Sequence, residues 1–418
     1  MGFMSKFKDF TQTGVKSGSS SDCEPESERK VFAHYMIGLT CEQPPHQWAH
    51  DIRTAKEAGI DGFALNIGPS DFWTEIQLHQ AYQAAEQAGG FVLFLSFDMA
   101  AGSWNIPQVV HLINQHQQSA AQMMVDGKPL VSTFEGTGWA DNWAAVRDQT
   151  AGIFFIPDWS SLGPYGVGSK LNIIDGAFSW DAWPKAGMTK MTAAEDLLYK
   201  ENLKGKKYMM GVSPGFYTNL PQWSKNWYCS SESLWHDRWQ QVLEILPDFV
   251  QIITWNDYGE SSYICDTVPK QIVPGADKYV IDYPHTAFRA ILPYLVAAYK
   301  AGSSKVDLPG DDMAVAWYRT TPAEAGPDGG TRWGQGGCDS AARGARDVIS
   351  IMAATRGSTS LRVTIGDREW AFETRSKTRV SYFEVPFDCH TVGSVKISLD
   401  GKTAWGPAIT NECCHGQV

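Results

Sequence analysis

Two carboxylates stand three residues apart in the segment ITWNDYGESSY, residues 253–263. They are Asp257 and Glu260, and the apolar run FVQII precedes the segment, as a buried strand would. Two carboxyl groups in unlike surroundings can supply a proton donor and a proton acceptor, which cleavage of a glycosidic bond requires. The other interpretation is a solvated loop, with Asp257 as a turn residue and Glu260 as a surface charge. The spacing leaves both open, and it does not tell a retaining from an inverting separation of the carboxyl groups.

Further polar residues occur at the ends of other apolar runs. They are Asp98, Glu135, Asp158 and Asp181, with Asn66 in a similar place in an earlier run. A single Asp after a strand often caps the next helix. Here the acids are interleaved with tryptophans, whose flat rings stack on sugar rings, namely Trp159, Trp180 and Trp183. The pattern favours one shared cleft that binds a polyol over a set of separate helix caps.

The elements that would position these residues are strand-like runs with helical patterns between them. The runs are VFAHYMIGL (31–39), GFALNIG (62–68), FVLFLSFD (91–98), PLVSTFEG (129–136), GIFFIPDW (152–159), GAFSWDAW (176–183), KYMMGVSPGFY (207–217) and DFVQIITWND (248–257). A long helix over 285–302 would close the unit. Eight such repeats predict an α/β fold, a (β/α)₈ TIM barrel over residues 30–303, with its site at the C-terminal ends of the strands. A doubly wound sheet is the rival, but IGLTCEQPP after the first run is not a Gly-rich phosphate turn.

The two ends of the chain differ from the barrel segment in composition and in the pattern of their apolar residues. Residues 1–29 are rich in Ser, Gly and charge, which predicts a disordered N-terminal tail. Residues 311–418 contain short alternating runs divided by Gly, Asp and Ser, which predicts a C-terminal all-β, sandwich-like accessory domain.

Composition excludes several classes of function. The formal net charge is −11, which argues against nucleic acid or an anionic membrane as a partner. No run of about 18 apolar residues is present to span a bilayer. HExxH and CxxC motifs are also absent, so we expect no metal and no cofactor.

The sequence also bears on where the protein acts. Its first residues, MGFMSKFKDF, lack the apolar stretch of a signal peptide, and the chain has no Asn-x-Ser/Thr sequon. We therefore expect an intracellular protein. The alternative is a secreted protein whose signal is missing from this sequence.

Several segments carry a family resemblance. They are FAHYMIGLT, DIRTAKEAGIDGFALNIG, FLSFDM, FIPDW, FSWDAWP, MGVSPGFY and TWNDYGESSY. Together they resemble the fungal α-1,3-glucanases, called mutanases, of glycoside hydrolase family 71. The resemblance covers the whole barrel, about residues 31–300, and the C-terminal region is similar to the accessory domain of that family. It implies internal cleavage of α-1,3-glucan, a fungal wall polymer, with inversion and without a cofactor, by a protein that we expect to be a monomer.

The resemblance also implies the site residues. The catalytic pair would be Asp257 and Glu260, and we assign Glu260 as the general acid and Asp257 as the base. Neighbours that would bind the substrate or tune the pair are Asn66, Asp98, Asp158, Trp159, Trp180, Asp181, Trp183, Trp255, Asn256 and Tyr258. Two alternatives remain: an α-glucan-binding barrel that does not cleave, and a hydrolase of a different α-glucan.

Overall fold

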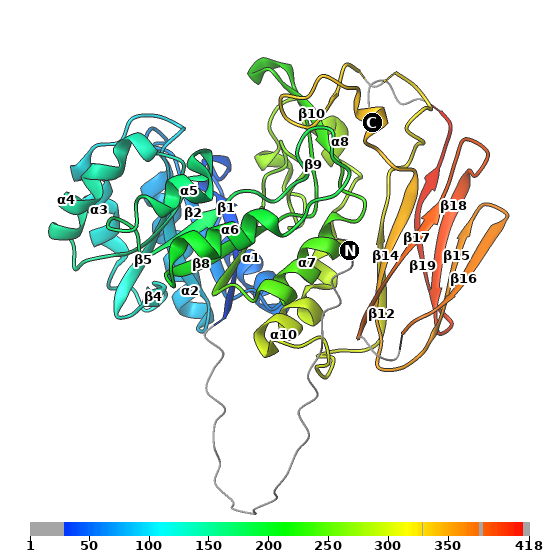
Figure 1. Ribbon diagram of the computed structural model, residues 1–418, viewed down its shortest axis with the longest axis horizontal. Helices are drawn as coiled ribbons and strands as arrows, with labels where there is room; N and C mark the ends of the chain where they lie inside the picture. Colours follow the sequence, from blue (N-terminus) through cyan, green and yellow to red (C-terminus); the bar gives the residue numbers. More distant parts are fainter. Residues whose placement is uncertain (1–28, 328, 376–378, 413–418) are drawn as a thin grey trace, which may run out of the picture.

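The computed structural model describes residues 29–327, 329–375 and 379–412. Figure 1 shows two parts side by side, a barrel with its helices and a module of antiparallel strands coloured orange to red. The disordered tail expected over residues 1–29 lies outside the described residues, apart from Arg29.

Eight parallel strands form the first part. They are β1 (Lys30–Met36), β2 (Gly62–Ile67), β3 (Val92–Asp98), β5 (Lys128–Phe134), β6 (Phe154–Asp158), β7 (Gly176–Ser179), β8 (Lys207–Val212) and β11 (Phe249–Ile252). Each pairs with its neighbours in the order β3-β2-β1-β11-β8-β7-β6-β5, and β3 also pairs with β5, which closes the ring. A short strand, β4 (Met124–Val125), pairs antiparallel with β5. The predicted TIM barrel is confirmed.

Helices surround the barrel. They are α1 (Pro45–Glu57), α2 (Thr74–Ala88), α3 (Ile106–His116), α4 (Trp143–Asp148), α5 (Gly163–Gly168), α6 (Ala194–Leu203), α7 (Leu234–Ile245), α8 (Asp277–Val280), α9 (Thr286–Ala290) and α10 (Leu292–Ala301). The single helix expected over 285–302 is two helices, α9 and α10. Pro293 lies in the first turn of α10, where its missing N–H costs nothing, whereas inside a helix it would remove a hydrogen bond. In the described part of the chain, no helix is long and apolar enough to cross a membrane.

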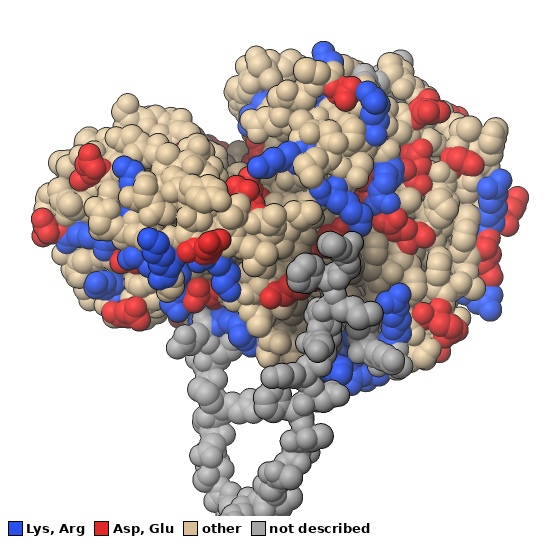
Figure 2. Space-filling view, in the orientation of Figure 1, with Lys and Arg blue, Asp and Glu red and all other residues tan. Residues whose placement is uncertain are grey.

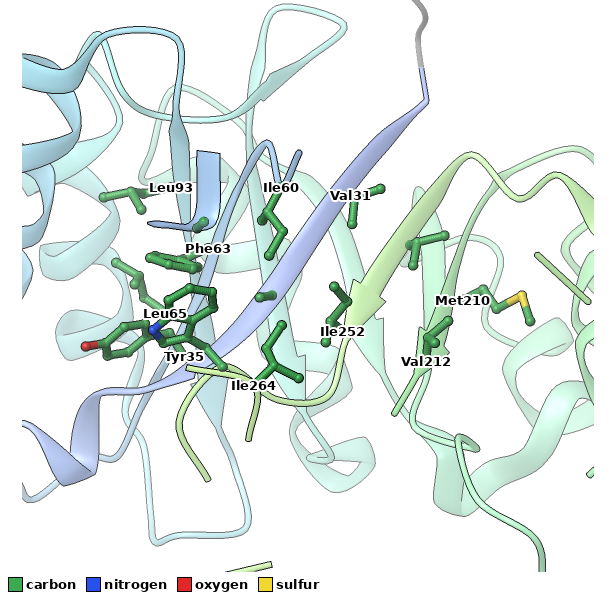
Figure 3. Close-up of a cluster of buried hydrophobic side chains, with 14 of the residues drawn as sticks. Val31, Tyr35, Ile60, Phe63, Leu65, Leu93, Met210, Val212, Ile252 and Ile264 are labelled. Atoms are coloured by element: carbon green, nitrogen blue, oxygen red, sulfur yellow. The ribbon is translucent and has the colours of Figure 1, made fainter. Parts of the chain in front are cut away.

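Side chains alternate between the two faces of each strand, and this alternation makes two cores. Inside the barrel, Phe32 contacts Phe94 and Phe249, with ring centroids 5.0 and 5.7 Å away. On the outer face, Val31 and Phe63 pack in the layer between strands and helices (Figure 3). The parity of a residue along its strand therefore decides whether its side chain points into the barrel or toward the helices.

A hairpin interrupts the repeat after β8. It consists of β9 (Phe216–Leu220) and β10 (Lys225–Cys229), which pair antiparallel. The run 207–217, expected as one strand, ends at Val212, shortly before Pro214, which has no N–H to donate to a ladder. A short strand from the C-terminal region, β13 (Arg332–Trp333), pairs parallel with β10. The sequence patterns predict neither the hairpin nor this third strand.

The C-terminal module is a pair of antiparallel sheets, as expected for a sandwich. One contains β12 (Met313–Trp317), β14 (Val348–Ala354) and β17 (Val380–Pro386). The other contains β15 (Ser360–Ile365), β16 (Arg368–Glu373), β18 (Gly393–Leu399) and β19 (Lys402–Ile409). Alternate residues such as Ile351, Val363 and Val395 face each other and form a separate apolar core.

Candidate active site

The C-terminal ends of the barrel strands open into a hollow. Figure 2 shows it between the loops of the barrel and the projecting segment that carries β9 and β10. Because side chains alternate between the two faces of a strand, several of the expected residues point toward this hollow, the mouth of the barrel. Asp158 shares the inner face of β6 with Phe154 and Ile156, and Trp180 packs on the barrel-interior core just beyond β7. This is the end of a TIM barrel at which active sites lie.

The chain after β11 brings Asp257 and Glu260 together. The backbone N–H of Asp257 donates to Thr254 Oγ1 over 2.8 Å, and that of Glu260 donates to Asp257 Oδ1 over 3.0 Å. The turn closed by these bonds places Glu260 beside Asp257 rather than on the opposite face of a strand. Its main chain is fixed from outside, because Tyr217 N–H donates to the Glu260 carbonyl over 3.1 Å and Tyr279 Oη donates to the Gly259 carbonyl over 2.8 Å.

The two carboxyl groups have unlike electrostatic surroundings. Burial and the charge of Glu260 raise the pKa of Asp257 to about 7, and the charge of Lys225 opposes this rise. Glu260 has a cation of its own, because Lys225 Nζ lies 2.6 Å from Glu260 Oε1. Near neutral pH, Asp257 can therefore hold a proton, whereas Glu260 is the member of the pair that lies against an ammonium group. These charges favour the reverse of the expected order, in which Glu260 is the acid.

Asp158 is the last residue of β6 and is fully buried. Burial raises its pKa to about 8, although hydrogen bonds from Ser160 act against the rise. Ser160 donates its backbone N–H and its hydroxyl to Asp158 Oδ1, over 3.0 and 2.5 Å, and Ser160 Oγ accepts the N–H of Trp180 over 2.7 Å. Among the described residues, Asp158 Oδ2 has no hydrogen-bond partner. Asp158 thus fixes the loop that carries Trp180 and does not itself reach the surface.

Two other expected acids line the same mouth and are partly exposed. Burial raises the pKa of Asp98, and hydrogen bonds from the N–H groups of Ala101 and Ala100 and from Asn66 reduce that rise. Asn66 is 4% exposed at the end of β2. Burial also raises the pKa of Asp181, and the positive charge of Lys185 opposes this rise. Both acids remain candidates for hydrogen bonds to sugar hydroxyls.

Aromatic rings form one wall of the mouth. Trp180 contacts His34 and Phe134, with ring centroids 4.9 and 4.8 Å apart. Trp183 donates its indole N–H to the Gly215 carbonyl over 3.0 Å and lies 5.1 Å from the ring of Phe216. Trp180 and Trp183 are both partly exposed, so each can offer a ring to a sugar.

Besides Asp158 and Asn66, four of the expected substrate-binding residues are buried. Trp159 is 0% exposed because it follows Asp158 in the strand direction and so points outward, toward Phe155 and the helix layer. The others are Trp255, Asn256 and Tyr258, at 1%, 1% and 0% exposure. They cannot stack on, or donate directly to, a bound sugar in this structure.

These buried residues support the loop that carries Asp257 and Glu260. Asn256 Oδ1 accepts the N–H of Met36 over 2.8 Å and ties the loop to the end of β1. Tyr258 Oη donates to the Asp266 carbonyl over 2.8 Å. Trp255 packs on Phe63, with ring centroids 5.0 Å apart. In the sequence, these large polar side chains look like ligand-binding residues. Only the fold shows that they are buried.

The structure adds residues that the sequence analysis missed. Lys225, Phe216 and Trp227 reach the site from the β9–β10 hairpin, and the rings of Phe216 and Trp227 stack with centroids 5.5 Å apart. No motif marks them, because the hairpin itself was not predicted. In the described ranges, no group of three or more His, Cys, Asp or Glu side chains could hold a metal ion.

A separate cavity of about 930 Å³ lies between the barrel and the sandwich. Phe216, Tyr217 and Ser261 line it on the barrel side, and Trp317 and Trp405 on the other. Neither Asp257 nor Glu260 is among the residues that line this cavity.

Comparison with known proteins shows the family of this chain. A family model described as glycosyl hydrolase family 71 matches residues 27–418. The glucan endo-1,3-alpha-glucosidase agn1 of Schizosaccharomyces pombe is 33% identical over 406 residues, which cover 92% of each chain. A mutanase of Penicillium rubens is 37% identical over 72% of this chain and 68% of its own. The ascus wall endo-1,3-alpha-glucanase of S. pombe is 31% identical over 81% of each. The chain belongs to glycosyl hydrolase family 71.

Proposed function

We propose that this protein cleaves internal bonds of α-1,3-glucan with inversion at the anomeric carbon, using Asp257 and Glu260 as its catalytic pair. The observation that carries the proposal is the unlike pair itself: one buried carboxyl with a raised pKa beside a carboxylate paired with Lys225. The linkage is supported by the names of the relatives, which are endo-1,3-alpha-glucanases and a mutanase.

In the proposed mechanism, Asp257 is the general acid. Its proton passes to the glycosidic oxygen as the bond to the anomeric carbon breaks, which leaves a neutral alcohol as the leaving group. Glu260 is the general base. It takes a proton from a water molecule that attacks the anomeric carbon from the opposite face, so an α bond yields a β hemiacetal.

The partly exposed residues of the mouth would hold the polymer. Trp180 and Trp183 would stack on the apolar faces of glucose units, and Asp98 and Asp181 would accept hydrogen bonds from hydroxyl groups. Asp158, Trp159, Asn256 and Tyr258 would act through the residues that they hold in place. The mouth is an open hollow (Figure 2), which suits entry of an internal segment of a chain.

Digestion of a panel of polymers tests this proposal. Purified protein is incubated with insoluble α-1,3-glucan and with α-1,4- and α-1,6-linked glucans, and new reducing ends and product sizes are measured. We expect release from the α-1,3 polymer only, with oligosaccharides of several lengths early in the reaction. Binding without release would favour a glucan-binding protein, and release from another linkage would favour a different α-glucanase.

We also propose that the protein acts as a monomer inside the cell, and that neither nucleic acid nor a membrane is a partner. The net charge of −11 and the lack of sequons support these points. Light scattering after gel filtration measures the mass in solution, for which we expect a value near 46.2 kDa. Fractionation of the source cells tests the location.

A further inference from the structure

Lys225 forms an ion pair with a carboxylate of the loop that carries Asp257 and Glu260, residues 254–262. Its Nζ lies 2.6 Å from Glu260 Oε1, and the two side chains are 35% and 19% exposed. Burial alone would lower the pKa of Lys225, but Glu260 and Asp257 together raise it above its usual value. At this distance and in these surroundings, the ammonium group both orients the Glu260 carboxylate and stabilises its charge.

Lys225 is not part of the barrel repeat. It is the first residue of β10, opposite Leu220 of β9 in the hairpin. The same hairpin reaches the main chain after Asp257, through the hydrogen bond from Tyr217 N–H to the Glu260 carbonyl. The position of the hairpin therefore sets the position of the cation and helps to set that of its carboxylate.

The C-terminal region holds the hairpin in place. Strand β13 pairs with β10 at Trp227 and Tyr228, and the Gly334 N–H donates to the Tyr228 carbonyl over 2.7 Å. Next to Lys225, the Asn226 Oδ1 accepts the hydroxyl of Thr331 over 2.8 Å. Thr331 is 0% exposed, so this hydrogen bond does not compete with water.

The sandwich anchors the chain that follows β10. The Glu232 carbonyl accepts hydrogen bonds from Trp317 Nε1 over 3.0 Å and from Ser350 Oγ over 2.5 Å. The Glu232 carboxylate accepts the hydroxyl of Tyr228 over 2.6 Å and the N–H of Arg346 over 2.9 Å. Both ends of β10 are thus fixed by residues that follow the barrel in the sequence.

We propose that Lys225 is a positioning residue for Glu260, and that the segment 329–334 holds the hairpin that carries Lys225, so that the C-terminal region is part of the catalytic apparatus. The inference rests on the proposed function, because it gives Lys225 a task only if Glu260 takes part in the reaction. It assigns the C-terminal region a task in catalysis besides any contact with glucan.

A loss of the Lys225 charge has a definite sign in the pH profile of kcat/KM. The charge of the ammonium group opposes the rise in the pKa of Asp257, so its removal should make Asp257 hold its proton to higher pH. The basic limb of the profile requires a protonated acid, so this limb should move to higher pH, by about one unit. A residue with only a structural task would lower the rate without moving the basic limb.

Four variants and one double variant test the proposal. Lys225→Met should lower kcat by about 10- to 100-fold and move the basic limb to higher pH, as the loss of an oriented acid–base partner predicts. Lys225→Arg keeps the charge and should restore the profile and most of the rate.

Thr331→Val removes the hydroxyl at nearly constant volume and should lower kcat by about fivefold, the effect of one buried hydrogen bond. In the Lys225→Met background, Thr331→Val should have little further effect.

The control is Thr355→Val. Thr355 is 1% exposed, and its hydroxyl is 2.9 Å from that of Thr374 within the sandwich, away from β10. This variant should keep the wild-type kcat and profile.

The outcomes separate this inference from the proposed function. If the wild type does not release sugar from α-1,3-glucan, the proposed function fails. If the wild type is active but the Lys225→Met profile stays in place, or Lys225→Arg is no better than Lys225→Met, Lys225 does not position the base. If Thr331→Val costs as much in the Lys225→Met background as alone, or if Thr355→Val is equally impaired, the segment 329–334 does not act through Lys225.

Discussion

At the scale of single residues, the site depends on different environments for chemically similar groups. Asp257 and Glu260 are both partly buried, but only Glu260 has a cation within 2.6 Å. Desolvation is the largest cause of the raised pKa of Asp257, whereas Glu260 forms the ion pair with Lys225. The reaction needs such a difference, because a hydrolase of this type must hold one carboxyl protonated and the other ionised at the same pH.

The first prediction separates acid from base. Asp257→Asn and Glu260→Gln are nearly isosteric, and each should lower kcat on α-1,3-glucan by about 10² to 10⁴-fold. A substrate with a fluoride leaving group needs no acid, so Asp257→Asn should retain activity on α-glucosyl fluoride. Azide can replace the activated water, so it should rescue Glu260→Gln and yield the β-glucosyl azide. Rescue of the opposite variant in each assay would make Glu260 the acid.

The second prediction concerns Asp158 and the pH dependence of stability. Its pKa is about 8 in the folded protein, against about 3.9 in an unfolded chain. The native state therefore binds this proton more tightly, and stability is lost as the pH rises from about 4 to about 8. Asp158→Asn should lose less stability over that range than the wild type. Urea unfolding at pH 5 and pH 8 measures the difference; equal losses in both proteins would contradict the assigned pKa.

At the scale of elements, strand parity decides which of the neighbouring tryptophans can meet a ligand. Trp180 continues the inner face of β7, and Trp159 continues the outer face of β6. The two positions follow the same kind of strand and carry the same side chain, so they form a matched pair for mutagenesis.

The third prediction uses this pair. Trp180→Ala should weaken binding of α-1,3-glucan, with a loss of about 1–3 kcal/mol for one stacked ring, and should leave short oligosaccharides less affected. Trp159→Ala should instead cost about 3–5 kcal/mol of folding stability through a core cavity. Polymer pull-down and chemical denaturation measure the two effects. Equal loss of polymer binding in a folded Trp159→Ala protein would contradict the parity argument.

The barrel was predictable from the sequence because its strands are continuous apolar runs with helices between them. The closeness of Asp257 and Glu260 was also predictable, since both directly follow the last run and a turn joins them. The burial of Trp159 was not, because an Asp-Trp pair at a strand end does not reveal which residue faces inward. Lys225 was missed for another reason: its hairpin is held by β13, more than a hundred residues later, and such a contact leaves no local pattern.

At the scale of the whole molecule, the barrel and the sandwich share an extensive polar interface. The Glu232 carbonyl, next to the barrel, accepts hydrogen bonds from Trp317 and Ser350 of the sandwich. The rings of His236 and Tyr382 stack across the same junction, with centroids 4.4 Å apart. Figure 1 shows the sandwich lying along one side of the barrel. Coupling of this kind makes independent unfolding of the two parts unfavourable.

The fourth prediction follows from this coupling. Calorimetry of the wild type should show one unfolding transition, and Trp317→Ala should lower its midpoint without splitting it. The substitution removes the hydrogen bond from Trp317 Nε1 to the Glu232 carbonyl. It also removes the contact between the rings of Trp317 and Phe288, whose centroids are 5.2 Å apart. Two separate transitions in the wild type would mean that the interface does not couple the parts.

The stereochemistry of the first product tests the central claim most directly. A soluble α-1,3-gluco-oligosaccharide is mixed with a large amount of enzyme, and the anomeric protons of the new reducing ends are followed by NMR before mutarotation. The two-carboxylate account with Glu260 activating water predicts that the β anomer appears first and the α anomer only later. Initial release of the α anomer would contradict it, because it would require a covalent glycosyl-enzyme or another double displacement.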